Sequence, residues 1–148
     1  MKHAHTYNLS VADVAEHFAL NPRTIRARLQ SGDLDGVRTD GQWRLCWADV
    51  FAAEQGPTPS KARLASYKRP LLSKKGFGSE WKLSKRTVER RIADGLPTRK
   101  VFGSVRIAPH DAENWMRKRF NIPSARQKAK RRQQQAHEEQ QQPGSATA

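Results

Sequence analysis

The chain has 148 residues, with 28 Lys and Arg side chains against 14 Asp and Glu, so its net charge is +14. A potential of this sign attracts polyanions, either nucleic acid or an acidic membrane surface. The single cysteine excludes an intrachain disulfide and a zinc cluster built on cysteines. No run approaches the roughly 18 apolar residues of a membrane span, and the N-terminus lacks the apolar core of a secretory signal, so we expect a cytoplasmic location.

The charge is unevenly distributed along the chain. Residues 1–55 hold six basic and seven acidic side chains, and residues 56–70 hold four basic and no acidic ones. Residues 71–120 hold 13 basic and five acidic side chains, and residues 121–148 hold five and two. Because phosphate contacts follow positive potential, we expect a polyanion to bind the last two thirds of the chain more strongly than the first third.

The sequence contains an internal repeat, which indicates a repeated structural unit. At an offset of 63 residues, Arg23, Thr24, Arg28 and Gly32 align with Arg86, Thr87, Arg91 and Gly95. At an offset of 62 residues, Gly41, Arg44 and Asp49 align with Gly103, Arg106 and Asp111. We place the one missing residue at the tip of a hairpin, where changes of length cost little.

Residues 6–55 carry the signals of two helices, a hairpin and a closing helix. Ser10 and Asn21 are favoured N-caps, Gly32 ends the second helix, and Asp40-Gly41 is a strong signal for a two-residue hairpin turn. The expected elements are helices at about 10–18, 21–32 and 49–54 and strands at 36–39 and 42–45. This order is that of a winged helix-turn-helix domain.

Residues 71–120 repeat the same order. Ser84 caps the second helix and Gly95 ends it. Strands at 100–102 and 104–107 flank Gly103, which indicates a tighter hairpin, and Asp111 caps a closing helix. The first helix is the weak element, because Gly76 and Gly78 each cost up to ~1 kcal/mol relative to Ala. We therefore expect that helix to be short or irregular.

Two segments lie outside the repeats. Residues 56–70 indicate a polar linker that would span about 50 Å when extended, enough for both domains to bind one duplex. Residues 121–148 form a basic, Gln-rich tail that we expect to be flexible or partly helical, because it lacks an apolar stripe. The predicted fold is mainly α with short β-hairpin wings: two tandem winged helix-turn-helix domains and this tail.

A helix-turn-helix places its second helix in the major groove, where Arg side chains bridge N7 and O6 of guanine. The residues expected to contact DNA are Asn21, Arg23, Thr24, Arg26, Arg28, Arg38, Gln42 and Arg44 in the first domain and Ser84, Lys85, Arg86, Thr87, Arg90, Arg91, Arg99, Lys100 and Arg106 in the second. Arg44 and Arg106 either contact DNA or pair with the aspartate five residues later. Glu89 either accepts from a cytosine amino group or pairs with Lys85, which we favour.

Catalysis would need clustered carboxylates with a metal, or an activated nucleophile. The acidic residues and the five histidines are scattered along the chain. We therefore expect that the chain is not an enzyme and that it uses no metal or cofactor.

Two motifs carry a family resemblance: Asn21-Pro22-Arg23-Thr24-Ile25-Arg26 with Gly32, and Ser84-Lys85-Arg86-Thr87-Val88-Glu89-Arg90-Arg91-Ile92 with Gly95. Together with Trp43-Arg44-Leu45 and Val105-Arg106-Ile107 they resemble the excisionase, or recombination directionality factor, type of MerR-like winged helix-turn-helix proteins. The resemblance implies an accessory DNA-binding factor of a mobile genetic element, acting in excision or in transcriptional regulation. The alternatives are a plasmid partition or maintenance protein and a phage terminase-like small subunit.

The same resemblance implies the partners and the location. The partners would be double-stranded DNA and an integrase or another protein encoded by the element, with cooperative or filament-like assembly on DNA as a further expectation. The protein would lie in the bacterial cytoplasm, associated with the nucleoid, and no membrane partner is expected.

Overall fold

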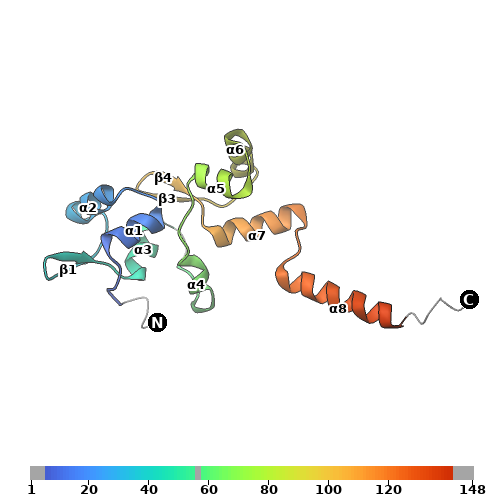
Figure 1. Ribbon diagram of the computed structural model, residues 1–148. Coiled ribbons are helices and arrows are strands. Elements are labelled where there is room, and N and C mark those ends of the chain that lie inside the picture. Colours follow the sequence, from blue (N-terminus) through green and yellow to red (C-terminus); the bar gives the residue numbers. More distant parts are fainter. Residues whose placement is uncertain (1–5, 56–57, 142–148) are drawn as a thin grey trace, which may run out of the picture. The chain divides into compact units, whose positions relative to one another are not determined.

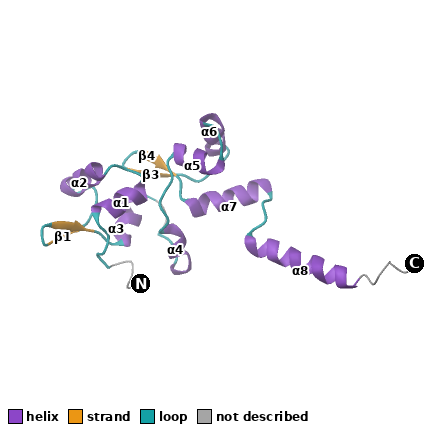
Figure 2. Ribbon diagram, in the orientation of Figure 1, coloured by secondary structure: helices purple, strands orange, loops and turns teal. Residues whose placement is uncertain are grey.

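A computed structural model describes residues 6–55 and 58–141 of the chain. Its fold is mainly helical, with two small antiparallel hairpins (Figures 1 and 2). The described residues belong to two compact units, 6–113 and 114–141. None of the helices in the described ranges is both long and apolar enough to cross a lipid bilayer.

The first repeat, residues 6–55, has the predicted order of elements. These are α1 (Val11–Phe18), α2 (Pro22–Ser31), β1 (Val37–Thr39), β2 (Gln42–Arg44) and α3 (Trp47–Ala53). The predicted signals of α1 and α2 are confirmed, whereas α3 begins at Trp47, two residues before the predicted start at Asp49. Ser10 and Asp13 form a capping box, the Asn21 side chain accepts from the amide of Arg23 at 2.9 Å, and Gly32 ends α2 with a left-handed backbone.

The second repeat, residues 71–120, has the same order. Its elements are α5 (Lys74–Trp81), α6 (Lys85–Ala93), β3 (Arg99–Val101), β4 (Ser104–Arg106) and α7 (Pro109–Phe120). The expectation of a short or irregular first helix is wrong, since α5 and α1 each have eight residues. Packing explains the glycine at position 78, because a Cβ there would lie 2.9 Å from the Leu83 carbonyl oxygen. The glycine allows α5 to approach the turn that follows it.

Both hairpins turn through two residues with positive φ. In the first, Thr39 pairs with Gln42 around Asp40-Gly41, as predicted. In the second, Val101 pairs with Ser104 around Phe102 and Gly103, so its turn is no tighter. The residue missing from the second repeat therefore lies between the second helix and the hairpin, where four residues separate Gly32 from β1 and three separate Gly95 from β3.

The segment predicted as a polar linker is partly folded. Residues 56 and 57 lie outside the described ranges, but η2 (Lys61–Arg63) and α4 (Leu64–Tyr67) follow them. The Tyr67 hydroxyl donates to Asp111, and Arg69 forms an ion pair with Glu113 at 2.8 Å. The segment connects the two repeats, as predicted, but its end does not act as a free tether, because its side chains bind the start of α7.

Part of the second repeat packs into the hydrophobic core of the first. Leu71, Val101 and Ala108 of the second repeat belong to the same buried cluster as the interior residues of the first repeat, which are Val11, Val14, Ala15, Phe18, Ile25, Leu29, Leu34, Leu45 and Val50. The amide of Leu71 also donates to the carbonyl of His17 at 2.7 Å. Residues 6–113 therefore form one compact unit, although Phe77, Val88 and Ile107 of the second repeat are buried outside this cluster.

The second unit contains the end of α7 and the helix α8 (Ala125–Gln141). Residues 125–140 are all exposed, and no apolar stripe runs along this part of the helix. Trp115 and Phe120 form a T-shaped ring pair. The tail is thus helical over most of its described length, which agrees with the part of the prediction that allowed a helix.

Candidate nucleic-acid interface

The helices α2 and α6 bury one side and expose basic residues on the other. Ile25 and Leu29 of α2 and Val88 of α6 lie in the interior. The exposed basic side chains are Arg23 and Arg26 on α2 and Lys85, Arg86 and Arg90 on α6. Within the described ranges, none of these five side chains makes a hydrogen bond or an ion pair, and Lys85 does not pair with Glu89 as expected. Five positive charges are therefore available on two equivalent helices.

Several predicted contact residues instead hold the starts of these helices. Asn21 and Ser84 are the N-caps of α2 and α6. Thr87 is half-buried and its hydroxyl hydrogen-bonds to that of Ser84 at 2.9 Å, and Thr24 is also half-buried. These four side chains position the exposed basic residues that follow them on the same helices.

The arginines near the ends of the two helices are less exposed. Arg28 pairs with Asp33 at 2.9 Å, and its guanidinium lies 5.0 Å from the centre of the Phe102 ring. The hydrogen bond from Arg28 lowers the pKa of the Asp33 carboxyl. Arg91, the equivalent of Arg28 on α6, is half-buried. Arg28 thus contacts the second hairpin as well as bordering the exposed face of α2.

The first hairpin, β1–β2, carries polar side chains at its exposed end. Arg38 donates to the Gly41 carbonyl at 3.1 Å and lies over the Trp43 ring, and Arg44 donates to Gln42 at 2.7 Å. Asp49 accepts instead from the Cys46 amide, and burial raises the pKa of the Cys46 thiol. The alternative pairing of Arg44 with Asp49 is therefore not formed.

The second hairpin, β3–β4, requires a correction. Only Lys100 of its predicted contact residues is exposed. Arg106 donates to the carbonyls of Phe18 and Ala19 at 2.7 and 2.9 Å rather than to Asp111, and burial lowers its pKa. Arg99 is 8% exposed. Both arginines are turned into the protein and are removed from the candidate interface.

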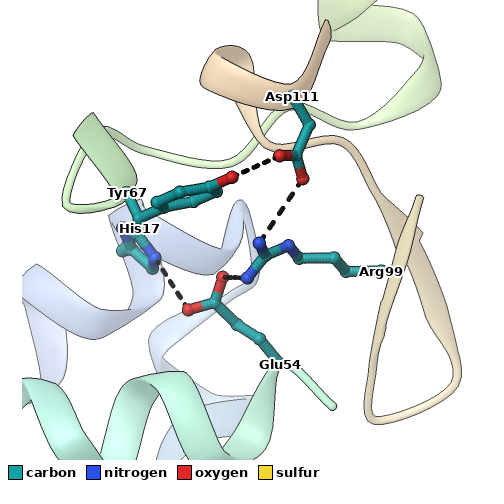
Figure 3. A network of polar contacts seen from close by, with 5 residues as sticks. All are labelled: His17, Glu54, Tyr67, Arg99 and Asp111. Carbon is teal, nitrogen blue, oxygen red and sulfur yellow. Dashed lines mark hydrogen bonds and ion pairs between the residues drawn. The ribbon is translucent and has the colours of Figure 1, made fainter. Parts of the chain in front are cut away.

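Arg99 lies at the centre of a buried polar cluster (Figure 3). Its guanidinium contacts Glu54 at 3.1 Å and Asp111 at 3.4 Å. Glu54, which is 0% exposed, also faces His17, with 3.5 Å between Nε2 and the carboxylate. Tyr67 donates to Asp111, and its pKa is raised by burial and by this hydrogen bond. We call His17, Glu54, Tyr67, Arg99 and Asp111 the interface cluster, because they join α1 and α3 to α4, β3 and α7.

This cluster was not predicted from the sequence, although its signals are present there. Glu54 follows the buried Val50 by four residues, and His17 follows the buried Val14 by three, so both lie on the inward sides of their helices. Arg99 precedes the buried Val101 by two residues on one strand, so both face the same side.

The candidate interface therefore consists of the exposed sides of α2 and α6, the exposed end of the first hairpin and Lys100. Among the described residues, no group of three or more His, Cys, Asp or Glu side chains is arranged to hold a metal ion. Comparisons of the chain with protein-family models, with curated proteins and with solved structures found no match.

Proposed function

We propose that this protein binds double-stranded DNA through two tandem winged helix-turn-helix domains, with α2 and α6 as their recognition helices. The observation that carries the proposal is the set of exposed cations on the second helix of each repeat, Arg23 and Arg26 on α2 and Lys85, Arg86 and Arg90 on α6, none of which pairs with another residue that the structure describes. In a helix-turn-helix protein this helix lies in the major groove. Its arginines can contact phosphate or guanine there.

The two helices are proposed to contribute unequally. Residues 71–120 have an excess of eight positive charges, whereas residues 1–55 have one more acidic than basic side chain. Counterion release makes affinity rise with the number of phosphates neutralised. We therefore assign the larger share of affinity to α6 and a supplementary contact to α2, with Arg38 and Gln42 of the first hairpin beside it.

The biological role is proposed from the motifs of the two helices. Their resemblance to excisionase-type proteins supports an accessory factor of a mobile genetic element, acting in excision or in the regulation of the element's genes. In that role the protein would act in the bacterial cytoplasm, on the nucleoid, beside an integrase or another protein of the element.

The test begins with selection of bound duplexes from a random library, followed by fluorescence anisotropy on the selected site. The double variant Arg86→Ala/Arg90→Ala should bind at least tenfold more weakly, since each base contact is worth about 1–3 kcal/mol. The variant Arg23→Ala/Arg26→Ala should lose less affinity than the α6 variant. Lys61→Ala/Arg63→Ala, which removes two exposed charges from η2, is the matched control.

Salt provides a second measurement on the same duplex. With six to ten phosphate contacts, the affinity should fall by about three to five decades between 50 and 200 mM salt. The proposal fails if no duplex binds at 50 mM salt, or if the control variant on η2 loses as much affinity as the α6 variant.

A further inference from the structure

We infer that residues 6–113 bind DNA as a single rigid body, so that the ligand is one duplex whose two half-sites have a fixed separation. The inference rests on the proposed function and specifies its ligand. The alternative is a pair of independent domains on a tether, which would accept half-sites at several separations because the tether sets only an effective concentration.

The second hairpin is the first support, because it docks on the first repeat. Arg106 donates to the carbonyls of Phe18 and Ala19, at the end of α1, where helix carbonyls lack partners within the helix. The Phe102 ring packs edge-on against Phe18, 6.1 Å between centres, and the Arg28 guanidinium lies over it. This contact therefore reaches α2, the helix proposed to bind DNA.

The interface cluster is the second support. Glu54 of the first repeat is fully buried, and its charged partner Arg99 comes from the second repeat. Burying two opposite charges gains little net stability, but separating them leaves an uncompensated buried charge, which is costly. The pair therefore strongly disfavours arrangements in which the two repeats move apart.

The third support is a set of apolar contacts between the two repeats. Leu71, Val101 and Ala108 share the core of the first repeat, and Leu71 bonds to the His17 carbonyl. Independent domains would each close their own core. Here β3 and the residue before α7 contribute to the core that holds α2, and α6 belongs to the same compact unit, so we infer that the fold sets the separation of the two helices.

A fixed separation has a consequence for DNA. One helical turn is about 10–10.5 bp and 34–36 Å. Inserting five base pairs between the half-sites turns one of them to the opposite face of the duplex, and inserting ten restores the face but moves it by one turn. A rigid body loses its contact with the second half-site in both cases, whereas tethered domains tolerate the insertion of ten base pairs.

The experiment uses the full chain and the selected duplex. Footprinting locates the two half-sites as the bases that the wild-type protein protects and that Arg23→Ala/Arg26→Ala or Arg86→Ala/Arg90→Ala leaves exposed. Affinity is then measured on duplexes with zero, five and ten inserted base pairs. The wild-type protein should bind both longer duplexes no better than a duplex carrying only the α6 half-site, and one duplex should be bound per protein.

A protein variant tests what sets the separation. Five Gly and Ser residues inserted between Thr58 and Pro59, an exposed and a half-buried position before η2, should leave the preferred spacing unchanged. The variant Glu54→Leu/Arg99→Met replaces the buried pair with apolar residues of similar size. If its circular dichroism is unchanged, it should bind the original duplex within about threefold, because the apolar contacts remain.

The outcomes are separable. If the wild-type protein tolerates ten added base pairs within threefold, or if two duplexes are bridged, the single rigid ligand is overturned while DNA binding stands. A shift of preferred spacing on insertion at Thr58 also overturns it. If no duplex is selected, the proposed function fails.

Discussion

The two hairpins of this protein have the same backbone and different surroundings. Each pairs three residues with three around a two-residue turn with positive φ. The turn of the first, Asp40-Gly41, is exposed, whereas Phe102 in the second packs against Phe18 and Arg28 of the other repeat. The hairpin that resembles a DNA-binding wing in sequence is therefore an internal contact in the second repeat.

The difference shows that local signals determine the shape of a hairpin and that the residues on its faces determine its use. Asp and Gly adopt left-handed backbone readily, so Asp40-Gly41 forms its turn without a tertiary partner. Phe102, with φ of +50°, is a bulky residue in a conformation that such residues avoid. Its ring contacts compensate for that backbone cost.

The largest expected effect comes from removing the charge at the centre of the docking contact. Arg99→Ala leaves Glu54 buried without its cation, which should lower the free energy of unfolding by about 3–5 kcal/mol. Arg38→Ala, on the exposed hairpin, should change it by less than about 0.5 kcal/mol. Urea unfolding of both variants measures the difference, and equal losses would mean that the two hairpins have equivalent roles.

The order of elements was predictable from residues that act locally. Ser10, Asn21 and Ser84 cap their helices through their own backbone neighbours, so their effects extend over only a few residues. The docking of the repeats was not predicted, because it depends on pairs such as Glu54 and Arg99, which are 45 residues apart. Charged residues on the inward side of a helix or strand were the available signal.

The candidate contact residues also divide into those that local pattern predicted correctly and those whose surroundings depend on residues far away in the sequence. Arg23, Arg26, Lys85, Arg86 and Arg90 were assigned from helical periodicity, and they are exposed as that reasoning requires. Arg99 and Arg106 were assigned because they lie on the predicted wing of the second repeat, and both are turned into the protein. A repeat of sequence preserves local structure but does not preserve the environment of each copy.

The helices α1 and α5 offer a second difference between the repeats. Ala15 is buried in α1, and Gly78 occupies the equivalent position in α5. Gly78→Ala gains up to ~1 kcal/mol of helix propensity, but its Cβ would lie 2.9 Å from a backbone oxygen, so we expect a net loss of about 1–3 kcal/mol. Gly76→Ala is the control, since its nearest neighbour is a serine side chain at 3.3 Å. A stabilised Gly78→Ala protein would contradict the packing argument.

Substitutions of Phe102 distinguish the free-energy cost of its left-handed backbone from the stability that its ring contacts provide. Phe102→Ala should lower the free energy of unfolding by about 1–2 kcal/mol, because a half-buried ring is removed. Phe102→Asn should lower it less, since Asn favours the left-handed region. Thermal unfolding of the two variants gives the order, and a Phe102→Asn protein less stable than Phe102→Ala would refute the assignment of backbone strain.

Tyr67 lies at the edge of the interface cluster, and it carries the smallest expected effect. Tyr67→Phe removes the hydrogen bond to Asp111, which should cost about 0.5–1.5 kcal/mol near neutral pH. Burial and this hydrogen bond raise the pKa of Tyr67 above 10.0. Its contribution is therefore complete below pH 10 and is lost as the pH rises towards the higher pKa of the folded state.

The pH dependence distinguishes this hydrogen bond from simple packing of the ring. The stability advantage of the wild-type protein over Tyr67→Phe should shrink between pH 9 and pH 11, because the unfolded state ionises first. Tyr7, the other tyrosine, also has a raised pKa, but it is present in both proteins and cancels in the comparison. Urea unfolding at several pH values measures the advantage, and a constant difference across this range would show that the hydroxyl does not bind Asp111 in the folded protein.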